Sequence, residues 1–185
     1  MARNDLQAQR RRMTEIYRPV TDRSTTSEYL NLQPWWRDSE VLGFIGGMLT
    51  LPFEESVPTV VVGPASSGYL VGSLAAVHLR VGFAAVVKDP PAYVDSDRWL
   101  KVTTPPDYKN RQMVFGVRDG MVLPSDRVLA VDDVVDTGSQ LLALKRLVEL
   151  AGASWLGASV VVDVLGQNTV RRDLNLRSIF NGREL

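Results

Sequence analysis

Short apolar runs recur through the second part of the chain, and each of them leads into a polar or glycine-containing turn. We predict strands at residues 58–63, 82–87, 113–117, 128–131 and 159–163. Their valines and other apolar residues follow one another without polar alternation, which is typical of strands buried on both faces of a parallel sheet. The pattern therefore predicts a sheet with layers packed against both of its sides.

Two stretches with helical spacing separate these strands. Residues 69–80 follow the first strand, and residues 139–151 place Leu141, Leu144 and Leu147 on one face before Gly152. A strand, a helix and a second strand make a βαβ unit, whose crossover is almost always right-handed. The alternation predicts an α/β fold, with a Rossmann-like central parallel sheet and helices on both faces.

The N-terminal part of the chain lacks this alternation. Residues 1–23 are polar and carry a basic cluster at residues 10–12, whereas residues 29–51 contain aromatic and apolar residues, among them Trp35 and Trp36. We predict a small N-terminal extension over residues 1–55 that packs on a core domain over residues 56–185. The basic cluster favours a solvated helix face, with a nucleic-acid arm as a more distant alternative.

Composition narrows the classes of protein. The 185 residues include 45% apolar and 23% charged residues with a formal net charge of zero, so neither a nucleic-acid nor a membrane partner is expected. No apolar run approaches the roughly 18 residues that span a bilayer, and the first residues lack a secretory signal core. With no cysteine, disulfides and thiolate metal sites are excluded, and a cytoplasmic protein is expected.

Paired carboxylates mark the most informative position. Asp132 and Asp133 follow the apolar strand at residues 128–131, at the end where open α/β sheets bind ligands. Ionised carboxylates accept hydrogen bonds from a sugar diol, and the next turn offers N–H groups and hydroxyls beside a helix N-terminus, which suits a phosphate. This turn consists of Asp136, Thr137, Gly138, Ser139 and Gln140.

The order of these groups predicts a ribose 5-phosphate site. The alternative is a solvated strand end with Thr137 or Ser139 as a helix N-cap. That alternative leaves two adjacent acids unexplained, because like charges repel unless a cationic or polar ligand lies between them. The site is therefore the favoured interpretation.

This stretch resembles the signature of the type I phosphoribosyltransferases: a hydrophobic strand, two acidic residues, two apolar residues, then a small or acidic residue and Thr-Gly. In that family the acidic pair holds the ribose hydroxyls of phosphoribosyl pyrophosphate (PRPP), and the following loop holds its 5-phosphate. The resemblance implies these roles for Asp132 and Asp133 and for residues 136–140. It extends from about residue 58 to the C-terminus, leans toward the adenine phosphoribosyltransferase-like branch, and makes the N-terminal extension a hood that selects the base.

The same resemblance implies a pyrophosphate loop after the first strand. The residues that match it are Ser66, Ser67, Gly68 and Tyr69, and Lys88 matches a lysine that ends the next family strand. Adenine-type enzymes usually place Glu and Arg in this loop, where this chain has Ala65 and Ser67. The alternative for Lys88 is a solvated lysine at a strand end.

Residues 89–110 are polar, contain four prolines and show no periodicity, so we predict a long loop of the lid or binding type. The resemblance makes it the mobile catalytic loop, where charge could come from Arg98, Lys101, Tyr108, Lys109 and Arg111. For Asp136 the resemblance implies a general base near the purine N7, as in the hypoxanthine-guanine and xanthine branch. The alternative is a carboxylate favoured by the helix dipole. His78, the single histidine, is interpreted as packed or solvated.

These features together predict a magnesium-dependent phosphoribosyltransferase. It would transfer the ribose 5-phosphate of PRPP to a nitrogenous base, with a purine favoured, and release pyrophosphate. Mg²⁺ would bind mainly through the substrate, and the resemblance implies a homodimer. A non-catalytic PRPP- or nucleotide-binding regulator is the first alternative, motivated by Ala65 and Ser67. A sugar-phosphate phosphatase is the second, but neither an activated nucleophile nor several metal ligands are evident, and Gly-x-Gly-x-x-Gly and Gly-x-x-x-x-Gly-Lys motifs are absent.

Overall fold

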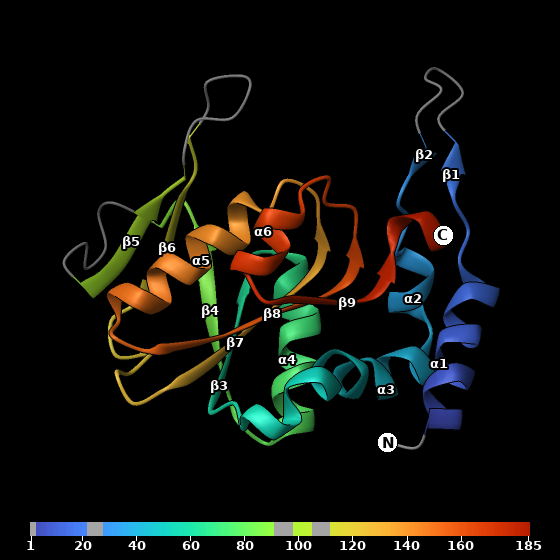
Figure 1. Cartoon of the computed structure of the whole chain (residues 1–185), viewed down its shortest axis with the longest axis horizontal. Coiled ribbons are helices and arrows are strands. Elements are labelled where there is room, and N and C mark those ends of the chain that lie inside the picture. Colours follow the sequence, from blue (N-terminus) through green and yellow to red (C-terminus); the bar gives the residue numbers. More distant parts are fainter. Residues whose placement is uncertain (1–2, 22–27, 91–97, 105–111) are drawn as a thin grey trace.

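The computed structural model describes residues 3–21, 28–90, 98–104 and 112–185, and its centre is a seven-stranded sheet (Figure 1). The strands lie in the order β5-β6-β4-β3-β7-β8-β9. Their bounds are β3 Val60–Pro64, β4 Gly82–Lys88, β5 Trp99–Thr103, β6 Val114–Arg118, β7 Arg127–Val135, β8 Ser154–Asp163 and β9 Leu176–Asn181. A separate two-stranded sheet pairs β1 Val20–Thr21 with β2 Glu28–Tyr29.

Helices cover both faces of the large sheet, as the apolar runs predict. Their bounds are α1 Arg3–Ile16, α2 Gln33–Arg37, α3 Ser39–Thr50, α4 Ser67–Leu79, α5 Ser139–Leu150 and α6 Asn168–Asp173, with 3₁₀ turns at η1 Leu51–Ser56 and η3 Gly182–Glu184. In Figure 1, α5 and α6 lie on the near face, and α3 and α4 pack on the other. Each face has its own cluster of buried apolar residues, so the central strands are covered on both sides.

The sheet is parallel at its centre and antiparallel at one edge. Strands β4, β3, β7, β8 and β9 run parallel, which confirms the predicted parallel core. Strands β5 and β6 form an antiparallel pair that extends the sheet beside β4. Strand β5 lies inside the segment predicted as a loop, because an edge strand that is half exposed on both faces lacks the buried apolar run of the central strands.

The strand order reverses between β3 and β7, and this reversal positions the site. The connection after β3 leads through α4 to β4 on one side, whereas β7 leads through α5 to β8 on the other. The two connections leave the sheet in opposite directions, which opens a crevice at the carboxyl ends of these neighbouring strands. Open α/β sheets bind their ligands at such a point.

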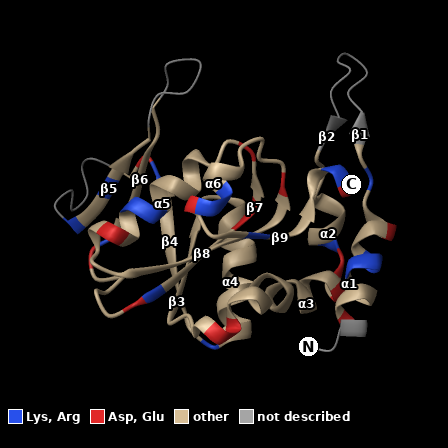
Figure 2. Cartoon of the chain, in the orientation of Figure 1, with Lys and Arg blue, Asp and Glu red and all other residues tan. Residues whose placement is uncertain are grey.

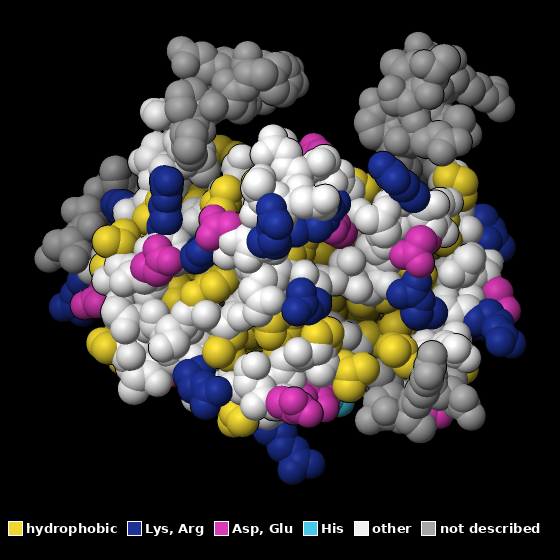
Figure 3. Space-filling view, in the orientation of Figure 1, with side chains coloured by type: hydrophobic (Ala, Val, Ile, Leu, Met, Phe, Trp, Pro, Cys, Tyr) yellow, Lys and Arg dark blue, Asp and Glu magenta, His cyan; other side chains and the backbone are white. Residues whose placement is uncertain are grey.

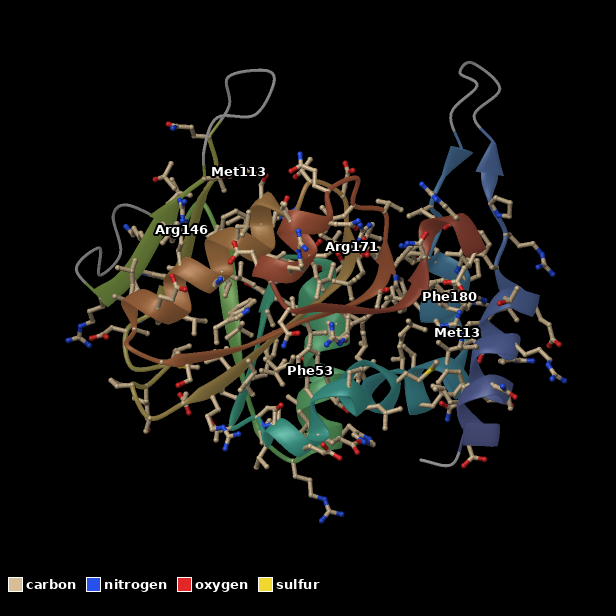
Figure 4. The ribbon with its side chains drawn as sticks, in the orientation of Figure 1. Met13, Phe53, Met113, Arg146, Arg171 and Phe180 are labelled. Carbon is tan, nitrogen blue, oxygen red and sulfur yellow. The ribbon has the colours of Figure 1, made fainter. Side chains whose placement is uncertain are left out.

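The N-terminal extension packs on the α4 side of the sheet. Trp35 is fully buried, donates a hydrogen bond from Nε1 to the Met13 carbonyl at 2.8 Å, and stacks on Phe180 with ring centroids 5.6 Å apart. Figure 4 labels Met13 and Phe180 where α1 approaches the end of β9. Helix α3 packs against α4 within the same apolar cluster, so this part of the extension forms one layer of the core. The boundary near residue 55 stays a prediction.

Candidate functional site

Asp132 and Asp133 lie on β7 beyond the last residue that pairs with β3. That pairing ends at Ala130, so the strand continues into the crevice with β8 alone as its neighbour. Asp132 is buried and Asp133 is half-buried. Burial, together with the charge of Asp133, raises the pKa of Asp132 to about 8, while the charge of Lys88 acts in the opposite direction. An acid this costly to ionise in the free protein is suited to a site that receives hydroxyl donors or a cation.

The turn after β7 wraps around a cavity of about 340 Å³. The lining residues run continuously from Asp132 to Leu141, so every residue predicted for the diol and the 5-phosphate borders this one space. Gly138 has φ +79°, a conformation that L residues rarely adopt, and a Cβ there would lie 2.6 Å from Val170 Cγ1. The Thr137 and Ser139 hydroxyls are 3.0 Å apart in the turn that opens α5. The turn thus places two hydroxyls and a helix N-terminus beside the paired carboxylates.

The loop after β3 reaches the same carboxylates from the other side. A Cβ added at Gly68 would lie 2.5 Å from Pro64 Cδ and 3.1 Å from Asp132 Oδ1. A Cβ at Gly63 would lie 2.4 Å from the Gly68 carbonyl oxygen. The two glycines therefore let the start of α4 approach β7 closely, and the predicted pyrophosphate loop lies directly against the predicted diol site.

Hydrogen bonds within this loop decide which of its donors remain available. The Ala65 N–H donates to the Val86 carbonyl at 3.0 Å, and the Tyr69 hydroxyl donates to the same oxygen at 3.2 Å. The Tyr69 N–H donates to the Ser66 carbonyl at 3.2 Å, and burial raises the pKa of the Tyr69 phenol. Tyr69 therefore fixes the loop on β4, while Ser66, Ser67 and Gly68 retain the donors that a ligand could use.

Lys88 and Asp136 complete the set of predicted site residues. Lys88 ends β4 next to the loop, and within the described part of the chain its ammonium has no ion-pair partner. Asp136 is exposed at the border of the 340 Å³ cavity. Arg98 and Lys101 are exposed near and on β5, whereas Tyr108, Lys109 and Arg111 lie outside the described residues. His78 is half-exposed on α4, 3.6 Å from a Glu54 oxygen, as expected for a solvated histidine.

A second cavity, of about 580 Å³, is absent from the sequence-based prediction. It lies at the carboxyl ends of β8 and β9, against α6 and η3. Its wall contains an ion pair between the buried Asp163 and the half-buried Arg171: Arg171 Nε donates to Asp163 Oδ2 at 2.6 Å, and Nη2 donates to Oδ1 at 3.1 Å. The only sequence signal was an acid that ends the strand at residues 159–163, and its partner lies eight residues further on, on another element. Figure 4 labels Arg171 in this region.

Outside the two cavities, acidic and basic side chains are mixed on the surface. Figure 2 shows acidic residues at the ends of central strands and both signs on α6, and Figure 3 shows the two signs interspersed on the face in view. No three His, Cys, Asp or Glu side chains within the described ranges group as metal ligands, and no helix in those ranges is long and apolar enough to cross a bilayer. Among the described residues, Asp132, Asp133, Asp136 and Lys88 are therefore the charged groups that a ligand in the crevice would meet.

Known proteins are similar to this chain in sequence and in fold. The family model described as a phosphoribosyl transferase domain matches residues 53–179. An adenine phosphoribosyltransferase from Mycobacteroides abscessus is 30% identical over 143 residues, which cover 74% of each chain. The crystal structure of an adenine phosphoribosyltransferase from Rhodothermus marinus is 26% identical with a TM-score of 0.78, covering 95% of this chain and 99% of that one. An APRTase from Giardia lamblia, complexed with 9-deazaadenine, is 25% identical with a TM-score of 0.74, covering 98% of both chains.

Proposed function

The chain belongs to the phosphoribosyl transferase domain family, and on that premise we propose that it transfers the ribose 5-phosphate of PRPP to a nitrogenous base with release of pyrophosphate. The favoured acceptor is a purine, in keeping with the relatives named as adenine phosphoribosyltransferases. Its role would be nucleotide salvage. The match extends from η1 into β9 and so includes the loop after β3 and the turn after β7.

One observation carries the proposal: three groups suited to three parts of PRPP meet at the switch point of the sheet. The Asp132–Asp133 pair suits the diol, residues 136–140 enclose a cavity beside the pair, and the loop of Ser66, Ser67 and Gly68 touches Asp132 from the opposite side. A ribose between two phosphate-binding turns has this order. The juxtaposition supports PRPP more specifically than it supports a simple sugar phosphate.

The proposed roles follow from the available atoms. Asp132 and Asp133 would accept hydrogen bonds from the ribose hydroxyls, and Thr137, Ser139 and the N–H groups that open α5 would hold the 5-phosphate. Lys88, with the loop after β3, would hold the pyrophosphate. Gln140 borders the same cavity and would line the 5-phosphate site.

Asp136 would accept a proton from the acceptor base, and its exposed position at the border of the cavity supports this role. Attack on ribose C1 by a ring nitrogen would form the new C–N bond as the C1–O bond to pyrophosphate breaks, and the proton of that nitrogen would pass to Asp136. The residues present also fit Mg²⁺, because it commonly binds through one or two carboxylates together with substrate phosphates. Bound there, Mg²⁺ would offset the charge that develops on the leaving pyrophosphate.

The test is to incubate the protein with PRPP, Mg²⁺ and single bases, to measure pyrophosphate release, and to identify nucleotides by mass spectrometry. The Asp132→Asn/Asp133→Asn double variant should lower turnover at least about a hundredfold, since each lost charge-assisted hydrogen bond contributes roughly 1.5–3 kcal/mol. Asp119→Asn, at an exposed position outside the crevice, is the matched control. Circular dichroism would establish that the double variant is folded. Unchanged turnover in that variant would contradict the assigned site.

One feature favours a second candidate, a PRPP- or nucleotide-binding regulator on the same fold. Ala65 and Ser67 leave the loop after β3 without a charged side chain, so Lys88, at the end of β4, would be the cation that the described residues offer to the pyrophosphate. Isothermal titration calorimetry separates the two functions. PRPP binding without pyrophosphate release from any base of a broad panel would favour the regulator.

Assembly and location also belong to this proposal. We expect a homodimer, as the resemblance to the family implies, and the exposed Leu70 and Val77 on α4 would be covered in such an assembly. Sedimentation equilibrium measures the mass in solution. A cytoplasmic enzyme would be consistent with a soluble PRPP substrate.

A further inference from the structure

The 580 Å³ cavity adjoins the proposed ribose phosphate site. Val135 of β7 pairs with Asp163 of β8, and the Val164 N–H donates to the Val135 carbonyl at 3.0 Å. Val135 borders the 340 Å³ cavity, while Asp163 and Val164 border the larger one. The two spaces therefore lie one strand apart at the same edge of the sheet. A group attached to ribose C1 in the crevice could extend into the larger space, which exceeds the volume of a bicyclic base.

The acids near this cavity are already engaged. Asp163 is held by two guanidinium hydrogen bonds from Arg171 and also accepts from the Leu165 N–H at 2.8 Å. Glu184 forms an ion pair with Arg10 at 2.6 Å, and its other oxygen accepts from the Asn181 N–H at 2.6 Å. Neither acid is free to neutralise another cation.

Arg183 is a cation at this cavity that no acid neutralises among the described residues. It borders the cavity from η3, and its side chain has no hydrogen-bond or ion-pair partner among the residues that the structure describes. Its backbone is fixed, because the Arg183 N–H donates to Asn181 Oδ1 at 3.1 Å within a capping box closed by Glu184. The side chain is exposed at the border of the cavity, and an unpartnered guanidinium there is suited to a ligand that brings a hydrogen-bond acceptor.

The neutral polar side chains of the wall also offer hydrogen-bond donors. Asn168 Oδ1 accepts from Arg171 Nη1 at 2.6 Å, and Asn181 Oδ1 accepts from the Arg183 N–H. The side-chain amides of both residues therefore keep donors rather than acceptors for a ligand. An amino group on the ligand would add donors to these amide donors, whereas a ligand oxygen would accept hydrogen bonds from them.

We propose that this cavity receives the acceptor base and that Arg183 selects a base with a ring carbonyl oxygen over one with an exocyclic amine at the same position. The proposal rests on the proposed function and specifies the acceptor of that same site. Arginine pairs well with the 6-oxygen of a purine, whereas an amide side chain such as glutamine pairs with a 6-amine. The acceptor class would then differ from the adenine named for the relatives.

Titration calorimetry with inosine monophosphate and adenosine monophosphate tests the proposal without requiring turnover. The two nucleotides share the ribose 5-phosphate and differ at the 6-position of the base. The wild-type protein should bind inosine monophosphate about tenfold or more tightly, as expected for one charge-assisted contact. Arg183→Gln should reduce that ratio to near one or reverse it. Arg172→Gln, an exposed arginine on α6 that does not border the cavity, should leave the ratio unchanged.

The outcomes separate the two proposals. Equal affinity of the wild-type protein for both nucleotides, or a ratio that Arg183→Gln leaves unaltered, would overturn the role of Arg183 even if pyrophosphate release from adenine establishes the transferase. Failure to bind either nucleotide, combined with no pyrophosphate release from any base, would overturn the proposed function and this inference with it. Ribose 5-phosphate binding by both arginine variants would show that their phosphate cavity is intact.

Discussion

Substitution of Asp132 by asparagine should make the folded protein more stable at alkaline pH while weakening its binding of PRPP. The carboxyl is buried beside a second carboxylate, which raises its pKa from the ordinary value of 3.8 to about 8. The folded protein therefore keeps a proton on Asp132 over a range in which the unfolded chain has released it. Asparagine has the same shape and no charge, so the variant lacks this pH dependence.

The sign and the size follow from proton linkage. Because the pKa of this acid is raised on folding, its contribution to stability is fully present below pH 4 and is lost as the pH rises toward 8. Above pH 8 the group is ionised in both states, and stability no longer changes with its titration. The largest slope is about 1.4 kcal/mol per pH unit, and a shift of about four units sets an upper limit of about 6 kcal/mol. Asparagine also buries a polar group, but that cost is the same at every pH and leaves the pH dependence of the difference unchanged. We expect the variant to gain at least about 2 kcal/mol relative to the wild-type protein between pH 5 and pH 8.

Urea unfolding followed by tryptophan fluorescence at pH 5, 6, 7 and 8 measures the difference. Four tryptophans, of which Trp35 is fully buried, provide the signal. Asp119→Asn at an exposed position is the control and should show a difference independent of pH. The reasoning is refuted if the stability difference between Asp132→Asn and the wild-type protein stays constant across this range. Titration with PRPP on the same samples should show weaker binding to the variant.

Two further predictions concern the walls of the cavities. Gly138→Ala should cost about 1–2 kcal/mol of stability and weaken ribose 5-phosphate binding, because φ is +79° there and the new methyl group would lie 2.6 Å from Val170 Cγ1. Chemical denaturation measures the stability and calorimetry measures the affinity. An unaltered affinity would argue against the turn as a phosphate site. Arg171→Ala should cost about 3 kcal/mol in urea unfolding, because it leaves the buried Asp163 without its guanidinium. Arg172→Ala, with no such contact, should change stability by less than about 0.5 kcal/mol, and equal effects of the two substitutions would contradict the assignment.

Features that depend on local patterns could be predicted from the sequence. The valine-rich strands β3, β7 and β8 are buried on both faces, so their apolar runs are continuous, and the helix at residues 139–151 is observed as α5 Ser139–Leu150. The turn from Asp136 to Gln140 could be placed because it follows directly from the strand that carries the acidic pair. Residues this close in sequence stay close in any fold that contains the strand and the helix.

Features that depend on pairing between distant segments could not be predicted. Strand β5 has half-exposed residues, and its place at the sheet edge depends on pairing with β6 and packing against α5. The pair of Asp163 with Arg171 depends on how α6 returns over the end of β8. Tyr69 matches a family position in the pyrophosphate loop, yet its hydroxyl donates to β4, a direction that sequence spacing does not define. The cavity at η3 requires the last residues of the chain to reach the ends of β8 and β9.

Arg10 joins the two ends of the chain. From α1 it contacts the Ile179 carbonyl, lies 4.6 Å from the centroid of the Phe180 ring, and forms an ion pair with Glu184. Removal of the first helix would release Glu184 next to Arg183, and an internal carboxylate would then compete with any incoming base for the guanidinium. If Arg183 selects the base, acceptor preference would depend on both the opening and the closing segments, and a form without α1 would differ in substrate choice while its β7 crevice stays unaltered.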